Sequence, residues 1–407
     1  MDSSIQDFIL AHRTDDIARL PLVTGSMSAE NRLYVMRQIK GWQTARKKIP
    51  SWSRIGDLLY PQSLSLEQCS SELTALYKRH QVELFFKSIG ITPTSMADIT
   101  GGFGVDAFFL SPLFCSVDYI ERNGDLCDIA GHNSKCLKIK GLNVVCDDGI
   151  EYLTASEQHY NLIFADPARR DEHGGRTYAI SDCTPDILSS LDMLLSHCDV
   201  LMLKLSPMLD WHDVVSRINT GRGNVVAELH IVSVDNECRE LLVVITAHTQ
   251  APMRIFCVNN EQSFLFCPDE TDKGGFFVSK EDLVPGSWLH VPNSSIMKAG
   301  CFSILSSHFE MGAFSANSHL FLSSRKIEGF PGKTYLIDRI SSLNKKELRK
   351  NLSGIDKANI AVRNFPMTVA ELRNKLRLKD GGNTYVFATT LSDGSRVLVI
   401  CRRDFTE

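Results

Sequence analysis

The fold is decided by residues 96–106, which read Met96-Ala97-Asp98-Ile99-Thr100-Gly101-Gly102-Phe103-Gly104-Val105-Asp106. The start of this stretch predicts a short strand that ends at Asp98, the glycines predict a turn, and a helix is expected from Val105. Glycine permits positive φ and lets the backbone approach a ligand closely, and the N–H groups of the new helix would point at that ligand. The stretch therefore predicts a nucleotide-cofactor loop, with a purely structural glycine turn as the alternative.

Two carboxylates beside this loop narrow the choice of cofactor. The spacing of Gly102, Gly104 and Ala107 satisfies a loose dinucleotide fingerprint, but Asp98 and Asp106 would place negative charge beside a pyrophosphate. S-adenosylmethionine (SAM) carries a sulfonium and an ammonium and no phosphate, so the same carboxylates would attract it. We therefore expect SAM as the cofactor, bound by Asp98, Asp106 and the glycine turn.

Further acids follow the next two predicted strands. Glu121 comes twenty-three residues after Asp98, close to the roughly twenty expected for an acid that binds a ribose diol. A solvated surface glutamate is the alternative. Asp147 and Asp148 follow the third strand, and either could bond an adenine amino group.

Predicted strands alternate with helical stretches from residue 91 to about 248, as a doubly wound α/β sheet requires. Ligands on such sheets bind beyond the carboxyl ends of the strands, so the polar residues there should converge on one crevice. An antiparallel hairpin closes the series, which is typical of class I SAM-dependent methyltransferases, whereas a dehydrogenase would continue parallel. The strands after the first are expected at 116–120, 143–146, 160–165 and 200–203, and the hairpin at 225–234 and 240–246.

The strand at 160–165 leads into Asp166-Pro167. Proline fixes φ and removes one N–H, so this turn would deliver a carboxylate into the crevice on a stiff support. Methyl transfer from a sulfonium depends mostly on alignment of the acceptor's lone pair with the methyl carbon. We therefore expect Asp166 to hold the acceptor's N–H while the carbonyl of Pro167 accepts a second hydrogen bond; a structural capping aspartate is the alternative.

Composition places the 407 residues among ordinary globular proteins, with 43% hydrophobic and 23% charged residues and a pI near 6.3. No apolar run approaches a membrane span and the first residues lack a signal-peptide pattern, so a cytoplasmic location is expected. The twelve cysteines form no Cys-x-x-Cys pair and show no zinc-like spacing with histidine, so we expect neither a metal site nor a disulfide framework.

Charge is distributed unevenly along the chain. Residues 331–407 hold 15 Lys and Arg against 8 Asp and Glu, although the whole chain has a net charge of −4. A basic segment on an otherwise acidic protein is a footprint for nucleic acid, and a solvated charged face is the equally weighted alternative. The basic residues expected to contact phosphates are Lys345, Lys346, Arg349, Lys350, Arg363, Arg373 and Arg377.

Four regions are predicted along the chain. Residues 1–90 form a helical N-terminal region with helices at 5–20, 29–42 and 65–88, and residues 91–250 form the Rossmann-like domain. Residues 251–330 form a small α+β module. Residues 331–407 form the basic end, with helices at 344–352 and 368–376 followed by strands at 385–390 and 396–402.

Four motifs complete the pattern: Glu67-Gln68-Cys69-Ser70-Ser71-Glu72, Asp166-Pro167-Ala168-Arg169-Arg170-Asp171, Asp182-Cys183-Thr184-Pro185-Asp186 and Arg363-Asn364-Phe365-Pro366. With the glycine loop, including Thr100, and with Glu121 and Asp148, they resemble class I SAM-dependent methyltransferases. Over nearly its whole length the chain resembles the Bacteroidetes-type methyltransferase family with ferredoxin-like and THUMP-like C-terminal domains. The resemblance implies SAM as cofactor, a ferredoxin-like module at 251–330 and a THUMP-like domain at 331–407. THUMP domains proper bind RNA, which implies structured RNA as the partner.

The chain departs from the pattern of base-amine methyltransferases at the residue after Asp166-Pro167. Methyltransferases that act on exocyclic base amines usually carry an aromatic residue there to stack on the flipped base, whereas this chain has Ala168 and Arg169. Arg169 could stack on a base, contact a phosphate or pair with a nearby acid. Carbon-5 methylation is disfavoured because Lys204-Leu205-Ser206-Pro207 lacks the cysteine nucleophile of related RNA enzymes, and Cys183 is the only nearby candidate.

The expected function is methylation of a base nitrogen of tRNA or rRNA with SAM. Asp166 and Pro167 would orient the acceptor, and Arg169, Lys204 and Arg363 would bind the RNA. One alternative is a methyltransferase for a protein or small molecule, and another is a SAM-binding protein without catalysis.

Overall fold

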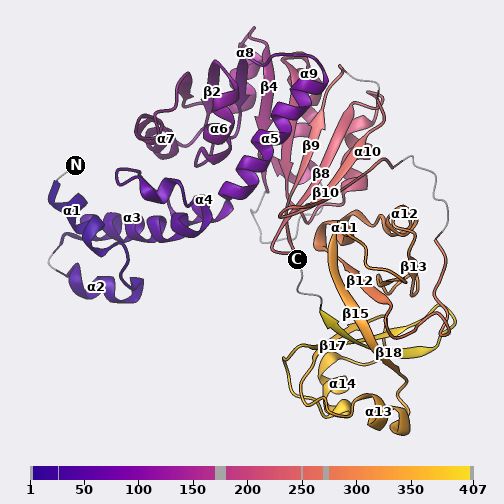
Figure 1. Cartoon of the computed structure of the whole chain (residues 1–407). Helices are drawn as coiled ribbons and strands as arrows, with labels where there is room; N and C mark the ends of the chain where they lie inside the picture. Colours follow the sequence, from indigo (N-terminus) through magenta and orange to yellow (C-terminus); the bar gives the residue numbers. More distant parts are fainter. Residues whose placement is uncertain (1–2, 26, 170–179, 249–250, 269–274, 404–407) are drawn as a thin grey trace. The chain divides into compact units, whose positions relative to one another are not determined.

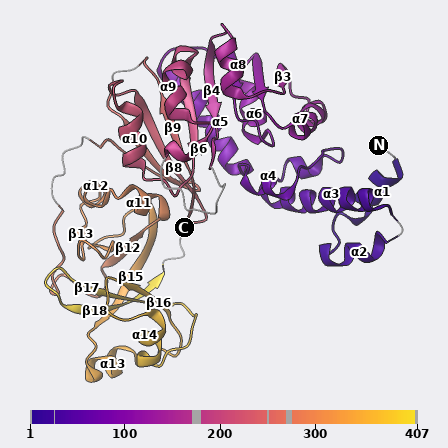
Figure 2. The same cartoon turned by 180° about the vertical axis from the view of Figure 1, so that it is seen from behind.

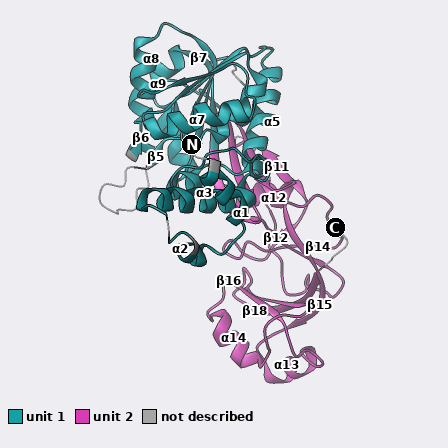
Figure 3. Cartoon of the chain, turned by 90° about the vertical axis from the view of Figure 1, so that its left-hand side faces the viewer, with its two compact units in different colours: residues 1–227, 242–251 teal, residues 228–241, 252–407 magenta. Residues whose placement is uncertain are grey.

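The computed structural model describes the chain except residues 1–2, 26, 170–179, 249–250, 269–274 and 404–407 (Figure 1). The described residues form two compact units, coloured separately in Figure 3. The first unit comprises residues 1–227 and 242–251, and the second comprises 228–241 and 252–407. The N-terminal helical region thus belongs to the same compact unit as the strands that carry the predicted cofactor loop.

The first 90 residues are helical, but two of the three predicted helices are broken. The predicted helix at 65–88 ends at Gln68 and restarts at Glu72, because Ser71 caps the second piece by accepting a 3.2 Å hydrogen bond from the N–H of Thr74. The predicted helix at 29–42 instead continues to Lys48, where basic residues suit a helix C-terminus. The elements are α1 Ser3–His12, η1 Ile17–Arg19, α2 Leu20–Val23, α3 Ala29–Lys48, η2 Trp52–Arg54, α4 Ser63–Gln68 and α5 Glu72–Ser88.

A doubly wound α/β core follows, as predicted. Strand β1 pairs in parallel with β2 and β4, β2 with β3, and β4 with β7, so the carboxyl ends of these strands lie at one edge of the sheet. Its strands are β1 Ser95–Asp98, β2 Ser116–Ile120, β3 Leu142–Val145, β4 Tyr160–Ala165 and β7 Cys198–Leu205. Its helices are α6 Val105–Leu110, η3 Ser111–Leu113, α7 Gly124–Cys136, α8 Gly149–Ala155, η4 Ile180–Asp182, α9 Ile187–Ser196 and α10 Trp211–Asn219.

The predicted hairpin is formed by β8 (Val226–Val234) and β9 (Glu237–Ile245). Asp235 and Asn236 join them with φ of 52° and 62°, the left-handed backbone that tight hairpin turns use. Two further strands extend the sheet: β10 (Arg254–Asn259) runs parallel to β8, and β11 (Gln262–Phe266) pairs antiparallel with β10. Within the described residues the order is β11-β10-β8-β9-β7-β4-β1-β2-β3.

A second sheet of seven described strands runs in the order β13-β14-β12-β15-β18-β17-β16. Because β12 pairs with β15, the regions predicted as 251–330 and 331–407 share one sheet. The strands are β12 Trp288–Pro292, β13 Gly312–Ala313, β14 Phe321–Ser323, β15 Gly332–Ser341, β16 Asn359–Arg363, β17 Thr384–Thr390 and β18 Arg396–Arg403. The helices are α11 Ser294–Ala299, α12 Phe302–His308, α13 Lys345–Asn351 and α14 Val369–Leu376.

Side chains alternate between two apolar clusters across this second sheet. On β17, Val386 packs in a cluster with Leu372 of α14, whereas the next residue, Phe387, packs in the cluster that holds Phe314. Successive side chains of a strand point to opposite faces, so both faces of the sheet are buried here. Figures 1 and 2 show α13 and α14 together beside β16 to β18.

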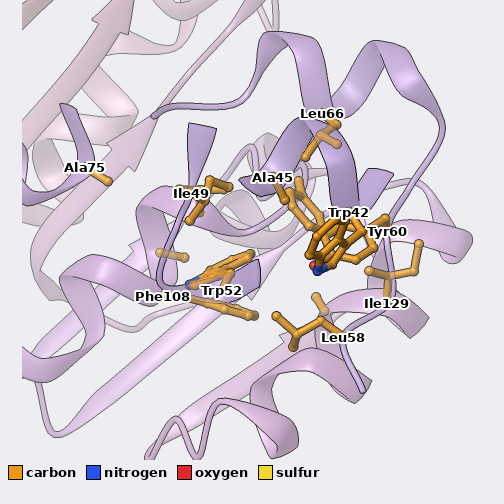
Figure 4. Close-up of a cluster of buried hydrophobic side chains, with 14 of the residues drawn as sticks. Trp42, Ala45, Ile49, Trp52, Leu58, Tyr60, Leu66, Ala75, Phe108 and Ile129 are labelled. Atoms are coloured by element: carbon orange, nitrogen blue, oxygen red, sulfur yellow. The ribbon is translucent and has the colours of Figure 1, made fainter. Parts of the chain in front are cut away.

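The N-terminal helices pack directly against the helix that follows the predicted cofactor loop. An apolar cluster joins Trp42 of α3 and Trp52 of η2 with Phe103 of the loop and Phe108 of α6, and Figure 4 shows most of its side chains. The ring centroids of Trp52 and Phe103 are 5.3 Å apart. This packing supports the loop from the side of the N-terminal region, and α5 lies against α6 beside it.

Candidate active site

The glycine loop is built as its sequence predicts, between β1 and α6. Gly102 and Gly104 have φ of +58° and +82°, and Gly104 caps the N-terminus of α6. Gly101 has no room for a side chain, because a Cβ would lie 2.5 Å from the ring of Tyr119. The hydroxyl of Tyr119 donates a 2.5 Å hydrogen bond to the carbonyl of Gly102, which fixes the turn against β2.

Asp98 ends β1 and is buried beneath this loop. Its Oδ1 accepts a 3.0 Å hydrogen bond from the N–H of Thr100. Burial raises the pKa of Asp98 to about 8, and the negative charges of Asp106, Asp166 and Glu121 add to the rise. Below about pH 8, Asp98 is therefore mostly neutral, and a nearby cation would favour its charged form.

Glu121 follows β2 and ties the loop to that strand. One carboxylate oxygen accepts a hydrogen bond from the N–H of Gly102, and the other accepts from the N–H of Asn123, each at 2.8 Å. The side chain predicted to bind a ribose therefore lies directly beside the glycine turn.

Asp147 and Asp148 lie in the turn after β3. Asp148 caps α8 by accepting a 2.9 Å hydrogen bond from the N–H of Ile150, and Asp147 accepts from the N–H of Asp148 at 2.8 Å. A Cβ on Gly149 would lie 2.2 Å from the carbonyl oxygen of Ile99, so this turn packs closely on the one after β1. The structure brings both aspartates to the cofactor loop, and the adenine contact of either one stays a prediction.

Asp166 ends β4 at the same edge of the sheet. Its N–H donates a 2.7 Å hydrogen bond to the hydroxyl of Thr100, and the ammonium of Lys204, from β7, contacts its carboxylate. The side chain of Asp166 remains 36% exposed, while that of Lys204 is only 10% exposed. Asp166 is thus a partly exposed carboxylate that Lys204 anchors from inside. Desolvation of its buried part raises its pKa despite the contact with Lys204.

Asp106 lies in the first turn of α6 and is buried among polar side chains. Its carboxylate is 3.2 Å from the ammonium of Lys78 and 3.6 Å from that of Lys204, and the hydroxyl of Ser70 donates to it at 2.7 Å. Burial raises the pKa of Asp106, but the two ammonium groups outweigh it, and the net pKa is lowered. The sequence predicts Asp106 as a cofactor ligand, but in the structure its two carboxylate oxygens contact the side chains of Lys78, Lys204 and Ser70.

Sequence reasoning missed Ser70 and Lys78 as members of the site. Ser70 stands in the polar motif at 67–72, which was a signal without an assigned role. Lys78 gives no signal, because a lysine in a helix is usually exposed and only packing shows that this one is fully buried.

The remaining predicted residues are placed as follows. Arg169 lies in β5 (Ala168–Arg169), whose backbone pairs with β6 (Cys183–Thr184), so that residues 169 and 183 are partners. Its side chain and residues 170–179 lie outside the described part. Pro167 is buried beside Asp166, and Arg363 is exposed at the end of β16 in the second unit.

The donor set suits SAM. Carboxylates of Asp98, Glu121 and Asp166 gather around a turn of positive-φ glycines. Asp98 resists ionisation mainly because it is buried, and the nearby negative charges add to this effect. A ligand that carries positive charge and approaches the glycine backbone would relieve this repulsion. No described group of three or more His, Cys, Asp or Glu residues is placed to hold a metal ion. Within the same residues, no helix is both long and apolar enough to cross a membrane.

Two family models match the second unit: a THUMP domain-like model at residues 332–403 and a ferredoxin-like domain model at 288–331. A curated relative from Mycoplasma mobile, named "Uncharacterized RNA methyltransferase MMOB5020", is 32% identical over 76 residues, 19% of this chain. The chain matches only 21% of that relative's length.

A solved structure from Porphyromonas gingivalis W83, named "putative methyltransferase", is similar over the whole length. It is 30% identical, the match covers 98% of this chain and 97% of that one, and the TM-score is 0.84. This similarity spans the helical N-terminal region, the sheet with its glycine loop and the C-terminal domains. The chain therefore belongs to this family of class I methyltransferases, which carry ferredoxin-like and THUMP-like domains at the C-terminus.

Proposed function

We propose that the protein transfers a methyl group from SAM to a base nitrogen of tRNA or rRNA. The observation that carries this proposal is the position of Asp166 at the end of β4. Its N–H bonds to Thr100 of the cofactor loop, and its carboxylate stays partly exposed. An acceptor nitrogen held there would lie beside the cofactor.

The residues at the edge of the sheet would hold SAM. Asp98 would attract its positive charge, and Glu121 would exchange its bond to Gly102 for bonds to the ribose. The carboxylate of Asp147 or Asp148 would bond the adenine amino group, and the glycine turn would provide close backbone contact. When bound, SAM supplies a methyl group activated by the sulfonium.

Asp166 would then act on the acceptor. Its carboxylate would accept a hydrogen bond from one N–H of the acceptor amine and orient the nitrogen lone pair, while the carbonyl of Pro167 would accept a hydrogen bond from a second N–H. Transfer would form the nitrogen–methyl bond and release S-adenosylhomocysteine, and the proton lost from the nitrogen would pass to the carboxylate of Asp166 or to water. Lys204 holds the carboxylate from behind, so its direction is set before the acceptor arrives.

RNA as the acceptor is supported by the second unit. Lys345, Lys346, Arg349 and Lys350 are all exposed on the single helix α13, where they can contact phosphates. Arg373 is less available than the sequence predicts, because its guanidinium bonds Asp380 at 2.6 Å and the carbonyl of Ala358 at 3.1 Å. The THUMP domain-like match and the name of the Mycoplasma relative agree with RNA.

The test is transfer of labelled methyl from SAM to total RNA from a strain that lacks this gene. The wild-type protein should label the RNA, and the Asp166→Ala variant should not. If confirmed SAM binding is accompanied by no labelled RNA, the RNA assignment is wrong.

A protein or small-molecule acceptor is the second candidate. It is favoured by Ala168, which stands where an enzyme acting on base amines would carry a stacking aromatic residue. The same assay on the protein and small-molecule fractions of the same strain separates the candidates. Binding of S-adenosylhomocysteine with no label in any fraction would indicate a SAM-binding protein without catalysis.

A further inference from the structure

We propose that Lys78 is a positioning residue for methyl transfer: through Asp106 and Lys204 it sets the direction of the Asp166 carboxylate. The inference rests on the proposed function and assigns a role in it to the N-terminal helices. Lys78 lies on α5, outside the glycine loop and the β4 turn. It contacts Asp106, one of the predicted cofactor ligands, at 3.2 Å.

The contacts form an unbroken chain. The ammonium of Lys78 is 3.2 Å from Oδ1 of Asp106, and Oδ2 of Asp106 is 3.6 Å from the ammonium of Lys204, which contacts Asp166. Ser70 braces the first link, since its hydroxyl donates to Asp106 at 2.7 Å and accepts from Lys78 at 3.1 Å. Each link joins a different element, namely α5, α6, β7 and the end of β4.

Charge balance explains why Lys78 would matter at a distance. The ammonium groups of Lys78 and Lys204 face the carboxylates of Asp106 and Asp166, so the charges of these four groups cancel. If Lys78 were replaced by an uncharged residue, Lys204 alone of these two lysines would have to balance the carboxylates of both Asp106 and Asp166. It would be drawn towards the buried Asp106, and its hold on Asp166 would loosen.

Burial makes this arrangement rigid. The side chain of Lys78 is 0% exposed and that of Asp106 is 9% exposed, so water does not screen their contact or replace it. The exposed fraction of the side chains increases along this series of contacts and reaches 36% at Asp166, where the acceptor is expected. The inner end thus fixes the geometry and the outer end remains accessible.

The first measurement does not depend on activity. Carbon-13 NMR of labelled aspartate carboxyls, with the Asp166 signal assigned by Asp166→Asn, would follow the titration of Asp166 in the wild type and in Lys78→Met. The titratable groups that face Asp166 include Lys204 from β7, Asp106 from α6 and Lys78 from α5, together with Asp98 at the end of β1 and the thiol of Cys69 after α4. We expect the pKa of Asp166 to rise in Lys78→Met, because a positive charge is lost and Lys204 shifts inward. An unchanged titration would overturn the proposal.

The second measurement is kinetic. Lys78→Met should lower kcat by about tenfold to a hundredfold, the effect expected of a misplaced catalytic group. The Kd for S-adenosylhomocysteine should stay within about threefold, because the proposed role concerns the acceptor side. A higher Kd with unchanged kcat would make Lys78 a support of the cofactor site and overturn the proposal. The matched control is Lys87→Met, an exposed lysine on the same helix, which should match the wild type in both measurements.

Lys78→Met leaves the buried carboxylate of Asp106 without its partner and could prevent folding. The double variant Lys78→Met with Asp106→Asn removes that carboxylate as well, so the test remains decisive. Asp106→Asn alone should lower kcat, and adding Lys78→Met should lower it no further, since both act through one link. A wild-type kcat in Asp106→Asn, or effects that multiply, would overturn the proposal. If the wild type methylates nothing, the proposed function fails, and the NMR titration still decides whether Lys78 acts on Asp166.

Discussion

The same residue types play opposite parts in two regions of this protein. At the edge of the first sheet, Lys78 and Lys204 are buried against Asp106, whereas on α13 four basic residues are exposed to solvent. A buried ammonium must be paired, so its position is fixed and its loss is costly. An exposed ammonium is mobile and hydrated, so it adds affinity for an anion without defining geometry. Lysine therefore supports chemistry in one region and would support binding in the other.

The largest effect is expected at Asp166, the partly exposed end of the contacts that run from Lys78 through Asp106 and Lys204. Asp166→Ala should lower kcat/KM for methyl transfer by about a hundredfold to ten-thousandfold, because the acceptor loses the group that orients its nitrogen. The Kd for S-adenosylhomocysteine should stay within about threefold. A variant that keeps most of its activity would show that Asp166 is a structural capping residue.

A pH dependence is the next largest effect and tests the buried carboxylate at the cofactor loop. Asp98 is neutral below its pKa of about 8 in the free protein, and a bound cation favours its charged form. Binding of SAM below pH 8 should therefore release a proton, and affinity should rise by up to about tenfold per pH unit until about pH 8 and then level off. Calorimetry in buffers of different ionisation enthalpy measures this release. The release should disappear in Asp98→Asn, and its persistence there would assign the proton to another group.

A smaller effect is expected from the packing of the glycine turn. Gly101→Ala would place a methyl group 2.5 Å from the buried ring of Tyr119, which should lower the free energy of unfolding by about 1–3 kcal/mol. Chemical denaturation measures it. The matched control is Gly131→Ala on α7, where no atom outside the neighbouring residues and the backbone of the helix itself lies within 4 Å of the added Cβ. That control should be neutral or stabilising by about 0.5–1 kcal/mol, and equal effects of the two changes would contradict the close packing.

The smallest effect per residue is expected at the exposed lysines. Replacing Lys345, Lys346 and Lys350 by alanine should weaken RNA binding and reduce the slope of log affinity against log salt by about two. Binding is measured at several salt concentrations with total tRNA. The corresponding arginine variants should keep both the affinity and the slope, and an unchanged slope in the alanine variant would place the RNA elsewhere. These substitutions are preferable to removing residues 331–407, because β15 and β18 lie inside the second sheet.

Local sequence patterns predicted the elements of the core closely. The strands at 116–120 and 160–165 match β2 and β4 residue for residue, because short apolar runs between turn signals are read locally. The split of the helix at 65–88 was missed because several serines in that stretch are good caps, and only packing selects Ser71. The pairing of β12 with β15 was missed because pairing between segments forty residues apart leaves no local pattern.

The candidate site shows the same division. By itself the sequence determined the glycine loop, the carboxylates at the strand ends and the Asp166-Pro167 turn, since each depends on a few adjacent residues and on the rule that ligands bind beyond the carboxyl ends of parallel strands. Only the tertiary structure decided that Lys78 and Ser70 reach Asp106 and that Lys204 joins Asp106 to Asp166. The physical reason is burial: whether a lysine is a solvated surface charge or one link in a neutral buried network depends on which elements pack around it, and that is not written in its neighbours along the chain.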